Sequence, residues 1–200
     1  MDLSKKNILV ITDGSEGMVS QVIGLAQEIS ENINSIKTKI IFPWSKLQPG
    51  LLPIFSWIFL NNLNFVNKPD IIISCGRKSV FLSIFLKKKY KKIINIHIQN
   101  PKVSLKNFDF IIAPDHDEIE GQNVLISKGA IHYLTLEDIN NCKNYLEDKV
   151  DKNRDVITLI LGGPTKYYSY REENIINIFS KIKKNLVESN LQLIVIPSNR

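Results

Sequence analysis

The stretch FIIAPDHDEIEGQN places two carboxylates and an imidazole directly after an apolar run and one proline. Three kinds of structure would fit Asp115, His116 and Asp117: a metal site, an acid–base pair, or an ordinary polar turn. A metal would need further ligands, and His97 and His132 show no ligand spacing that would supply them. We therefore favour His116 as a catalytic base held in position by Asp117, and we expect no metal.

The loop DGSEG follows the apolar run NILVIT and precedes apolar residues at helical spacing. Gly14 and Gly17 permit a tight turn and a close approach of the backbone at a helix start, where anions bind. Asp13 and Glu16 oppose an anion there, so a plain strand-to-helix turn is the alternative. Gln21 lies one turn into the helix, where its side chain can reach the loop. We include Asp13, Gly14, Gly17 and Gln21 among the candidate substrate-binding residues.

A basic loop, CGRKS, follows a second apolar run. Gly76 frees the backbone, Arg77 and Lys78 supply charge, and Ser79 can cap the helix that follows. The alternative is a solvated basic helix start with no ligand. We interpret Cys75 as a small residue at the end of a strand, because no partner that would activate it as a nucleophile is evident. Gly76, Arg77 and Ser79 join the candidate substrate-binding residues.

The loop LGGPTK is the strongest phosphate-type loop of the chain. Gly162 and Gly163 expose backbone N–H groups after an apolar run, Thr165 adds a hydroxyl and Lys166 adds a charge. The spacing differs from that of a P-loop, and a purely structural turn is the alternative. All four residues are candidates for binding substrate.

Apolar runs alternate with helical patterns along the whole chain, which predicts a parallel sheet covered by helices on both faces. The fold class is therefore α/β with a Rossmann-like sheet. We expect a helix over residues 51–63. Strands are expected over residues 7–12, 38–42, 70–74, 92–98, 109–113, 123–127, 156–161 and 191–196.

The strand-loop-helix pattern is interrupted by a polar, charged stretch over residues 148–155, which we interpret as a linker. The predicted organisation is a Rossmann-like domain over 1–147 and the first β-α-β unit of a second, incomplete one over 156–200. A lone unit leaves both sheet edges open, so we expect the sequence to be cut short. Ligands of open parallel sheets bind at the carboxyl ends of the strands, where the polar loops over 13–17, 76–79, 99–102 and 115–117 gather on one rim. The loop over 162–166 would face that rim across a cleft.

The 200-residue chain has a formal net charge of +6, which favours nucleotides, phosphates or acidic lipid surfaces as partners. Its 2 cysteines give no disulfide framework, so we expect a reducing cytoplasm. The apolar run LLPIFSWIFL is far shorter than the roughly 20 residues that span a bilayer. As a helix near lysines it could dock on anionic lipid at the inner membrane face, with burial in the core as the alternative.

Together these motifs resemble the mitochondrial fission (elongated mitochondria) proteins and their bacterial relatives. Met18 stands where relatives often have His. The resemblance adds Gln99 and Asn123 to the candidate substrate-binding residues. The matching positions, in chain order, are Asp13, Gly14, Gly17, Gln21, Gly76, Arg77, Lys78, Ser79, Ile98 to Lys102, Pro114, His116, Asp117, Asn123, Val124, Gly129, His132, Thr135 and Gly162 to Lys166.

The resemblance implies a fold similar to the two-domain glycosyltransferases of the GT-B type. In that fold the second domain usually holds the nucleotide of the donor sugar, the cleft holds the acceptor, and no metal is bound. We therefore expect nucleotide-sugar-dependent transfer, with Gly162, Gly163, Thr165 and Lys166 at the donor phosphates and Arg77 at a charged acceptor or phosphate. A nucleotide-sugar or another phosphorylated small molecule would be the partner, with no cofactor and no nucleic acid.

A second function fits the same resemblance. Plant members of the family are linked to recruiting a dynamin-type protein to mitochondria. The chain could accordingly be a non-catalytic scaffold that recruits a protein partner at a membrane surface. Nucleotide-sugar epimerase activity is disfavoured, because the sequence has neither a GxxGxxG dinucleotide loop nor a YxxxK pair.

Overall fold

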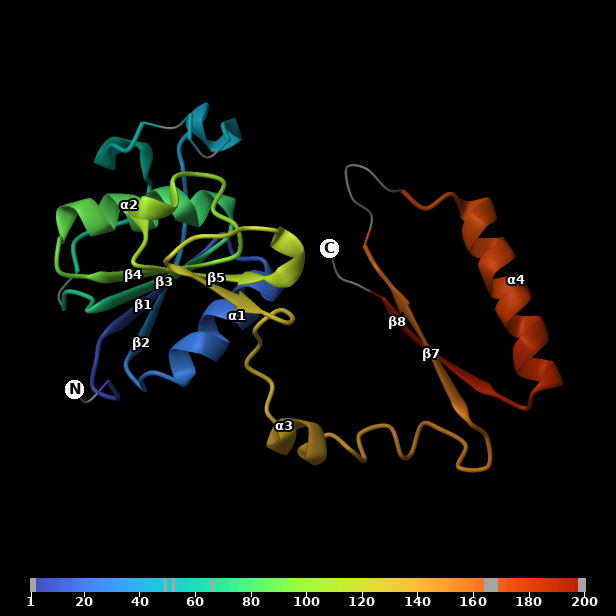
Figure 1. Ribbon diagram of the computed structural model, residues 1–200. Helices are drawn as coiled ribbons and strands as arrows, with labels where there is room; N and C mark the ends of the chain where they lie inside the picture. Colours follow the sequence, from blue (N-terminus) through green and yellow to red (C-terminus); the bar gives the residue numbers. More distant parts are fainter. Residues whose placement is uncertain (1–2, 49, 52, 66, 164–168, 198–200) are drawn as a thin grey trace. The chain divides into compact units, whose positions relative to one another are not determined.

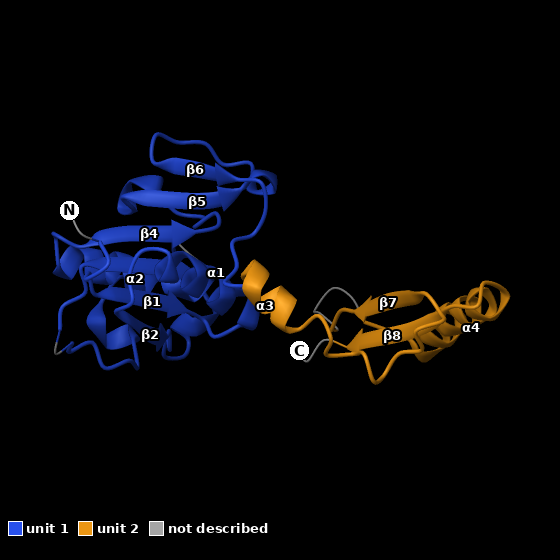
Figure 2. Cartoon of the chain, turned by 90° about the horizontal axis from the view of Figure 1, so that it is seen from below, with its two compact units in different colours: residues 1–134 blue, residues 135–200 orange. Residues whose placement is uncertain are grey.

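The structure is a computed structural model that describes residues 3–48, 50–51, 53–65, 67–163 and 169–197. The chain divides into two compact units, Met1–Leu134 and Thr135–Arg200, which Figure 2 colours blue and orange. Each unit is described by itself below. The predicted domain boundary with a linker over 148–155 stays a prediction.

The described part of the first unit contains a six-stranded sheet in the order β2-β1-β3-β4-β5-β6. Every neighbouring pair in it is parallel. The chain therefore runs from β1 outward to β2 and then returns to the other side of β1, which makes the β1/β3 boundary a topological switch point. The strands are β1 (Ile8–Thr12), β2 (Ile33–Lys37), β3 (Ile71–Cys75), β4 (Ile94–Ile98), β5 (Phe110–Pro114) and β6 (Val124–Ser127).

Helices α1 (Glu16–Gln27) and α2 (Arg77–Lys89) cover opposite faces of this sheet (Figure 1). Successive side chains of a strand point to opposite faces, so β1 contributes to two cores. Leu9 and Ile11 pack with residues of α2, whereas Ile8 and Val10 pack with residues of α1. β1 and β3 are accordingly buried at every position, and this two-sided burial confirms the predicted Rossmann-like α/β fold.

The second predicted strand lies in the wrong place. We expected it over 38–42, but β2 is formed by the more polar sequence INSIK at the edge of the sheet. An edge strand needs only part of its surface to be apolar, which hides it from a search for apolar runs. In the predicted range, Ile40 forms an isolated antiparallel bridge with Phe59.

The helix predicted over 51–63 is also wrong for the residues that the structure describes. This part of the chain has one short 3₁₀ helix, η2 (Ser56–Ile58), between Phe55 and Phe59, whose backbones are extended. Two residues that disfavour a helix, Gly50 and Pro53, precede η2. The aromatic residues of the predicted range would also lose side-chain freedom in a helix. A further 3₁₀ helix, η1 (Trp44–Lys46), lies in the same connection between β2 and β3.

Two more 3₁₀ helices, η3 (Leu105–Asn107) and η4 (Asp115–Asp117), flank β5 in the first unit.

In the second unit, β7 (Val156–Leu161) and β8 (Gln192–Pro197) pair in parallel, with α4 (Glu172–Glu188) between them in the chain. These elements form the predicted β-α-β unit. Helix α3 (Leu136–Asn141) begins with a capping box, in which the side chain of Thr135 accepts from the backbone N–H of Asp138 and the Asp138 carboxylate accepts in return. Among the described residues, no helix has both the length and the apolar character needed to cross a membrane.

Candidate functional site

The candidate site lies at the carboxyl ends of the central strands of the first unit. Asp13 follows β1 and Gly76 follows β3, on the two sides of the topological switch point. Asn100 follows β4, and Asp117 follows β5. Because neighbouring parallel strands end at the same edge, the sheet brings these four loops together. We call this edge the rim.

The first contact at the rim joins the loops after β1 and β3. Gly76 has φ +96°, and a Cβ atom added to it would overlap the sulfur of Met18 and lie 3.6 Å from Oδ2 of Asp13. Asp13 itself accepts a hydrogen bond from the backbone N–H of Ser15 at 3.1 Å through Oδ1. The absence of a side chain at Gly76 therefore lets the two loops approach, with a carboxylate beside the start of α2.

The second contact joins the loops after β4 and β5, and it corrects one expectation. Oδ2 of Asp117 accepts from the backbone N–H of Asn100 at 2.8 Å, so this carboxylate supports the β4 loop. In the part of the chain that the structure describes, the carboxylate of Asp117 makes no hydrogen bond or ion pair with His116. The imidazole lies instead beside Asp115, with 3.8 Å between Nδ1 and Oδ1. Sequence order suggested the wrong pair, because the 3₁₀ turn η4 points adjacent side chains in different directions.

Gln99 adds a strained backbone to the same loop. Its φ is +80°, which non-glycine residues adopt only when their surroundings enforce it. Its N–H donates to the carbonyl of Ile112 at 2.8 Å, so β5 holds the loop after β4 in this conformation. Strain of this kind costs about 1–3 kcal/mol and gathers at ligand sites. Of the two candidates the resemblance added, Gln99 lies at the rim.

The thiol of Cys75 lies at the end of β3, between the strands that precede Asp13 and Asp117 in the sheet. The thiol is fully buried at the end of β3, and burial together with the nearby charges of Asp13 and Asp117 raises its pKa to about 12. The thiol is therefore protonated at neutral pH, and the carboxylates of the β1 and β5 loops lie on either side of the end of β3. The structure agrees with the interpretation of Cys75 as a structural residue.

This environment predicts the reactivity of the thiols. Cys142 is exposed, whereas Cys75 is buried and protonated. At pH 8 we expect a thiol reagent to modify Cys142 rapidly and to reach Cys75 only after denaturant unfolds the chain. The Cys142→Ser variant should show no fast reaction in the folded state. Fast labelling of Cys75 in that variant would contradict the burial and the charge environment described here.

Lys37 is a rim residue that the sequence analysis missed. It is the last residue of β2, and a Cβ atom added to Gly14 would overlap the end of its side chain. Gly14 has φ +91°, and its N–H donates to the Thr12 hydroxyl at 3.1 Å. An ammonium group thus lies against the glycine loop. The misplaced second strand concealed this residue, since a strand over 38–42 would not end at Lys37.

The start of α2 supplies the rim with positive charge. Arg77 is the first residue of α2 and is exposed. Gly76 at the N-cap has no side chain to cap the helix, which leaves this end open to an anion. Ser79 does not cap the helix as expected, because its hydroxyl donates to the carbonyl of Cys75 at 2.8 Å inside the core.

Two other candidates have structural contacts. Gln21 is buried on α1, and its Nε2 donates to the carbonyl of Gly17 at 3.1 Å. Asn123 lies at the amino end of β6, opposite the rim, where its Nδ2 donates to the carbonyls of Leu105 and Phe108 at 3.0 and 2.8 Å. Both side chains hold local backbone, and Asn123 lies away from the other candidates.

In the second unit, Gly162 and Gly163 follow β7 directly, as expected for a loop at the carboxyl end of a strand. Thr165 and Lys166 lie outside the described residues. Their assignment to the donor phosphates therefore stays a prediction. Among the described residues there is no group of three or more His, Cys, Asp or Glu side chains that could hold a metal ion.

A cavity of about 390 Å³ lies at the other end of the sheet, near the amino ends of β1 and β3. Its lining includes Asn7, Asn34, Asn62, Asn64 and Phe65. No motif pointed to it. It holds none of the charged groups that meet at the rim, so we place the candidate site at the rim and not in this cavity.

The fold and the rim define the class of protein: a Rossmann-like α/β protein with a polar, charged site at the switch point of its sheet. Comparison with known families identifies a family within this class: residues 16–200 match the family Mitochondrial fission ELM1. The chain belongs to this family, which confirms the resemblance described above.

A curated relative from Rickettsia prowazekii (strain Madrid E), named "Uncharacterized protein RP120", is 34% identical over 213 aligned residues. The alignment covers 89% of this chain and 60% of the relative. The chain thus spans less than two thirds of the length of the curated relative that it matches. A comparison with the solved structures gives no match.

Proposed function

We propose that this chain takes part in nucleotide-sugar-dependent glycosyl transfer, or in a reaction derived from it, and that the rim binds the acceptor. The observation that carries the proposal is the pair of contacts at the rim, where Asp13 lies beside Gly76 and Asp117 accepts from the backbone N–H of Asn100 in the neighbouring loop. Carboxylates accept hydrogen bonds from sugar hydroxyls, and the open start of α2 with Arg77 suits a phosphate on the same molecule. Lys37 adds a second cation.

The transfer step needs one base. The acceptor hydroxyl gives its proton to the base, and its oxygen forms a bond to the anomeric carbon of the donor. The bond from that carbon to the nucleoside diphosphate breaks, and the diphosphate leaves with the electron pair. His116, which is exposed after β5, is the base we propose, with Asp115 beside it in place of Asp117. Asp117 would position the β4 loop through Asn100.

The donor would be held in the second unit. Gly162 and Gly163 supply backbone N–H groups after β7, and Lys166 would neutralise the leaving diphosphate. This assignment rests on the resemblance to GT-B enzymes. A phosphate-bearing nucleotide also fits the net charge of +6.

The Lys37→Ala variant tests the acceptor half of this proposal. We expect the dissociation constant for a sugar phosphate, measured by calorimetry with glucose 1-phosphate and related compounds, to rise about tenfold, since a charge-assisted contact is lost. Lys92→Ala is the matched control, because Lys92 is also exposed but precedes β4, at the edge of the sheet opposite the rim. Equal affinities in both variants and the parent chain would count against phosphate binding at the rim.

The Lys166→Ala variant tests the donor half. UDP- and GDP-sugars should bind this variant at least about tenfold more weakly than the parent chain. Lys152→Ala is the control, because Lys152 belongs to the same unit but pairs with Glu147 at 2.7 Å. Unaltered nucleotide-sugar binding in the Lys166→Ala variant would contradict the donor assignment.

The alternative proposal is a non-catalytic scaffold that recruits a protein partner at a membrane surface. The exposed aromatic residues between β2 and β3 favour it. A stoichiometric protein partner in a pull-down, together with no affinity for any nucleotide-sugar, would support the scaffold over the transferase.

A further inference from the structure

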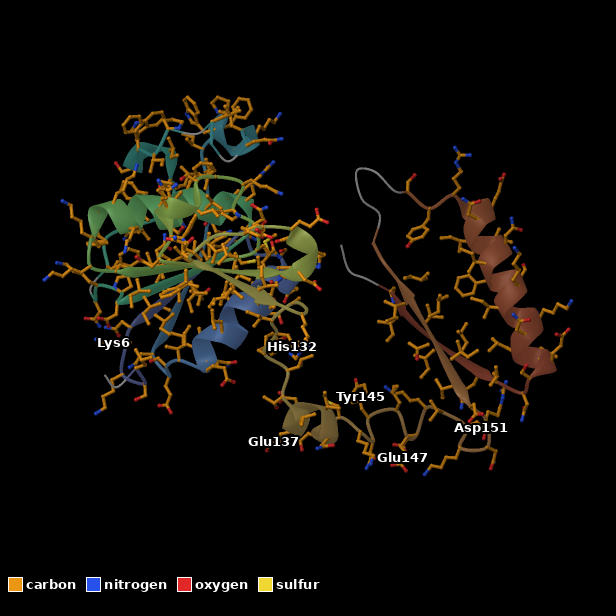
Figure 3. All side chains as sticks on the ribbon, viewed as in Figure 1. Lys6, His132, Glu137, Tyr145, Glu147 and Asp151 are labelled. Atoms are coloured by element: carbon orange, nitrogen blue, oxygen red, sulfur yellow. The ribbon has the colours of Figure 1, made fainter. Side chains whose placement is uncertain are left out.

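Among its described residues, the connection between β2 and β3 exposes six large apolar side chains. We call them the apolar crest: Ile41, Phe42, Leu51, Phe55, Trp57 and Leu60. Five of them are more than half exposed, at 69% for Phe42, 70% for Leu51, 56% for Phe55, 57% for Trp57 and 63% for Leu60. Figure 3 shows ring-bearing side chains on the outer side of this connection, away from α2. An apolar patch of this kind on a folded domain marks an interaction surface.

The crest is held outward by residues that pack inward. Ile58 and Phe59, which lie between Trp57 and Leu60 in the chain, are buried in the core that α2 shares with the sheet. The ring of Phe59 lies 5.7 Å from the ring of Phe85 on α2, measured between centroids. The packing of Ile58 and Phe59 in the core fixes the backbone here, so Trp57 and Leu60 are left exposed on the other side.

The rings of the crest are also ordered among themselves. Trp57 stacks on Phe55 with 6.2 Å between ring centroids, and it meets the edge of Trp44 at 5.7 Å. Such pairs stabilise an arrangement of rings without burying their outer faces. The crest thus presents a preformed aromatic surface.

The charge of the residues around the crest indicates which kind of partner it binds. Asp70 is the sole acidic residue between Glu31 and Asp109 in the sequence. The same region is rich in lysine, and Lys46 lies over the ring of Phe42 at 5.4 Å from its centroid. The exposed lysines in or next to the connection are Lys37, Lys39, Lys46 and Lys68.

We propose that the apolar crest docks on an anionic lipid bilayer. Tryptophan and phenylalanine rings settle at the boundary of headgroups and acyl chains, while nearby lysines reach the lipid phosphates. A second copy of the chain fits this surface less well, because it would bring lysine against lysine. The inference holds whether or not the chain transfers a sugar.

The sequence supplies its own reporter for a test, since its 2 tryptophans, Trp44 and Trp57, both lie in this connection. The full chain is mixed with vesicles of phosphatidylcholine alone or with about one third phosphatidylserine. We expect the tryptophan emission to shift to the blue with the anionic vesicles only, to be quenched by brominated acyl chains, and to revert in high salt. No shift and no quenching with anionic vesicles would overturn the proposal.

Variants locate the surface. The double change Phe55→Ser and Leu60→Ser keeps both tryptophans, and we expect it to lower the partition coefficient onto anionic vesicles at least about tenfold. Leu125→Ser is the control, because Leu125 on β6 is also 57% exposed but lies outside the crest. Equal loss in the control would contradict the assignment to the crest. If the chain instead forms a dimer at high concentration and its tryptophan emission does not change with vesicles, the crest binds a second copy.

Discussion

Replacing Gly76 with Ala is expected to lower the free energy of unfolding by at least about 2 kcal/mol. The backbone at Gly76 has φ +96° and ψ 156°, a region that is essentially reserved for glycine and costs other residues about 1–3 kcal/mol. The added methyl group would also overlap the sulfur of Met18, so that side chain must move. Overpacking of this kind adds about 1–3 kcal/mol when the neighbour cannot relax. Denaturant unfolding of the two proteins measures the difference.

Gly17→Ala is the matched control for this change. Gly17 is also a glycine near the rim, but it lies in the first turn of α1 and no atom lies within 4 Å of a Cβ added there. We expect this variant to be as stable as the parent chain or more stable by up to about 1 kcal/mol, because alanine favours a helix. Equal destabilisation at both glycines would contradict the close approach described at Gly76.

The second large effect is a loss of stability in mild acid that depends on His97. Its imidazole is fully buried, with Nδ1 2.8 Å from the hydroxyl of Ser74 and its ring 5.1 Å from that of Phe108. Burial lowers the pKa of His97 from 6.5 to about 3. Between these values the unfolded chain binds a proton that the folded chain does not, so stability falls as the pH falls through this window.

The expected loss from this one group is about 1.4 kcal/mol per pH unit below pH 6.5, or about 2 kcal/mol at pH 5. His97→Gln cannot titrate, so the free energy of unfolding of this variant should fall less steeply between pH 7 and pH 5. Ser74→Ala is the control: it removes the hydrogen-bond partner and lowers stability at every pH, but it keeps the buried imidazole and the steep dependence. Identical slopes for His97→Gln and the parent chain would show that His97 does not control this loss.

The sequence was sufficient to predict the strands that are buried on both faces of the sheet. β1, β3 and β4 are buried at nearly every position because helices cover both faces, and a search for apolar runs finds them. It failed for β2, an edge strand with three polar residues, and for the helix expected over 51–63. There the tertiary packing of Ile58 and Phe59 against α2 determines the backbone, and local pattern does not encode it.

The candidate site was predicted only as a set of loops. The rule that ligands bind at the carboxyl ends of parallel strands located Asp13, Gly76, Gln99 and Asp117. Which side chains meet depends on the strand order β2-β1-β3-β4-β5-β6, and this order is a property of the whole fold. That is why Asp117 contacts the Asn100 backbone and not His116, and why Lys37 was missed.

The central claim is that the rim is the ligand site, and a chemical-shift titration of the ¹⁵N-labelled chain tests it most directly. On addition of glucose 1-phosphate, we expect the backbone amides of Gly14, Gly76, Arg77 and Asn100 to shift together and to saturate with one dissociation constant. No shift of these amides would contradict the claim. So would shifts confined to Asn7, Asn34 and Asn64, which line the cavity at the opposite end of the sheet.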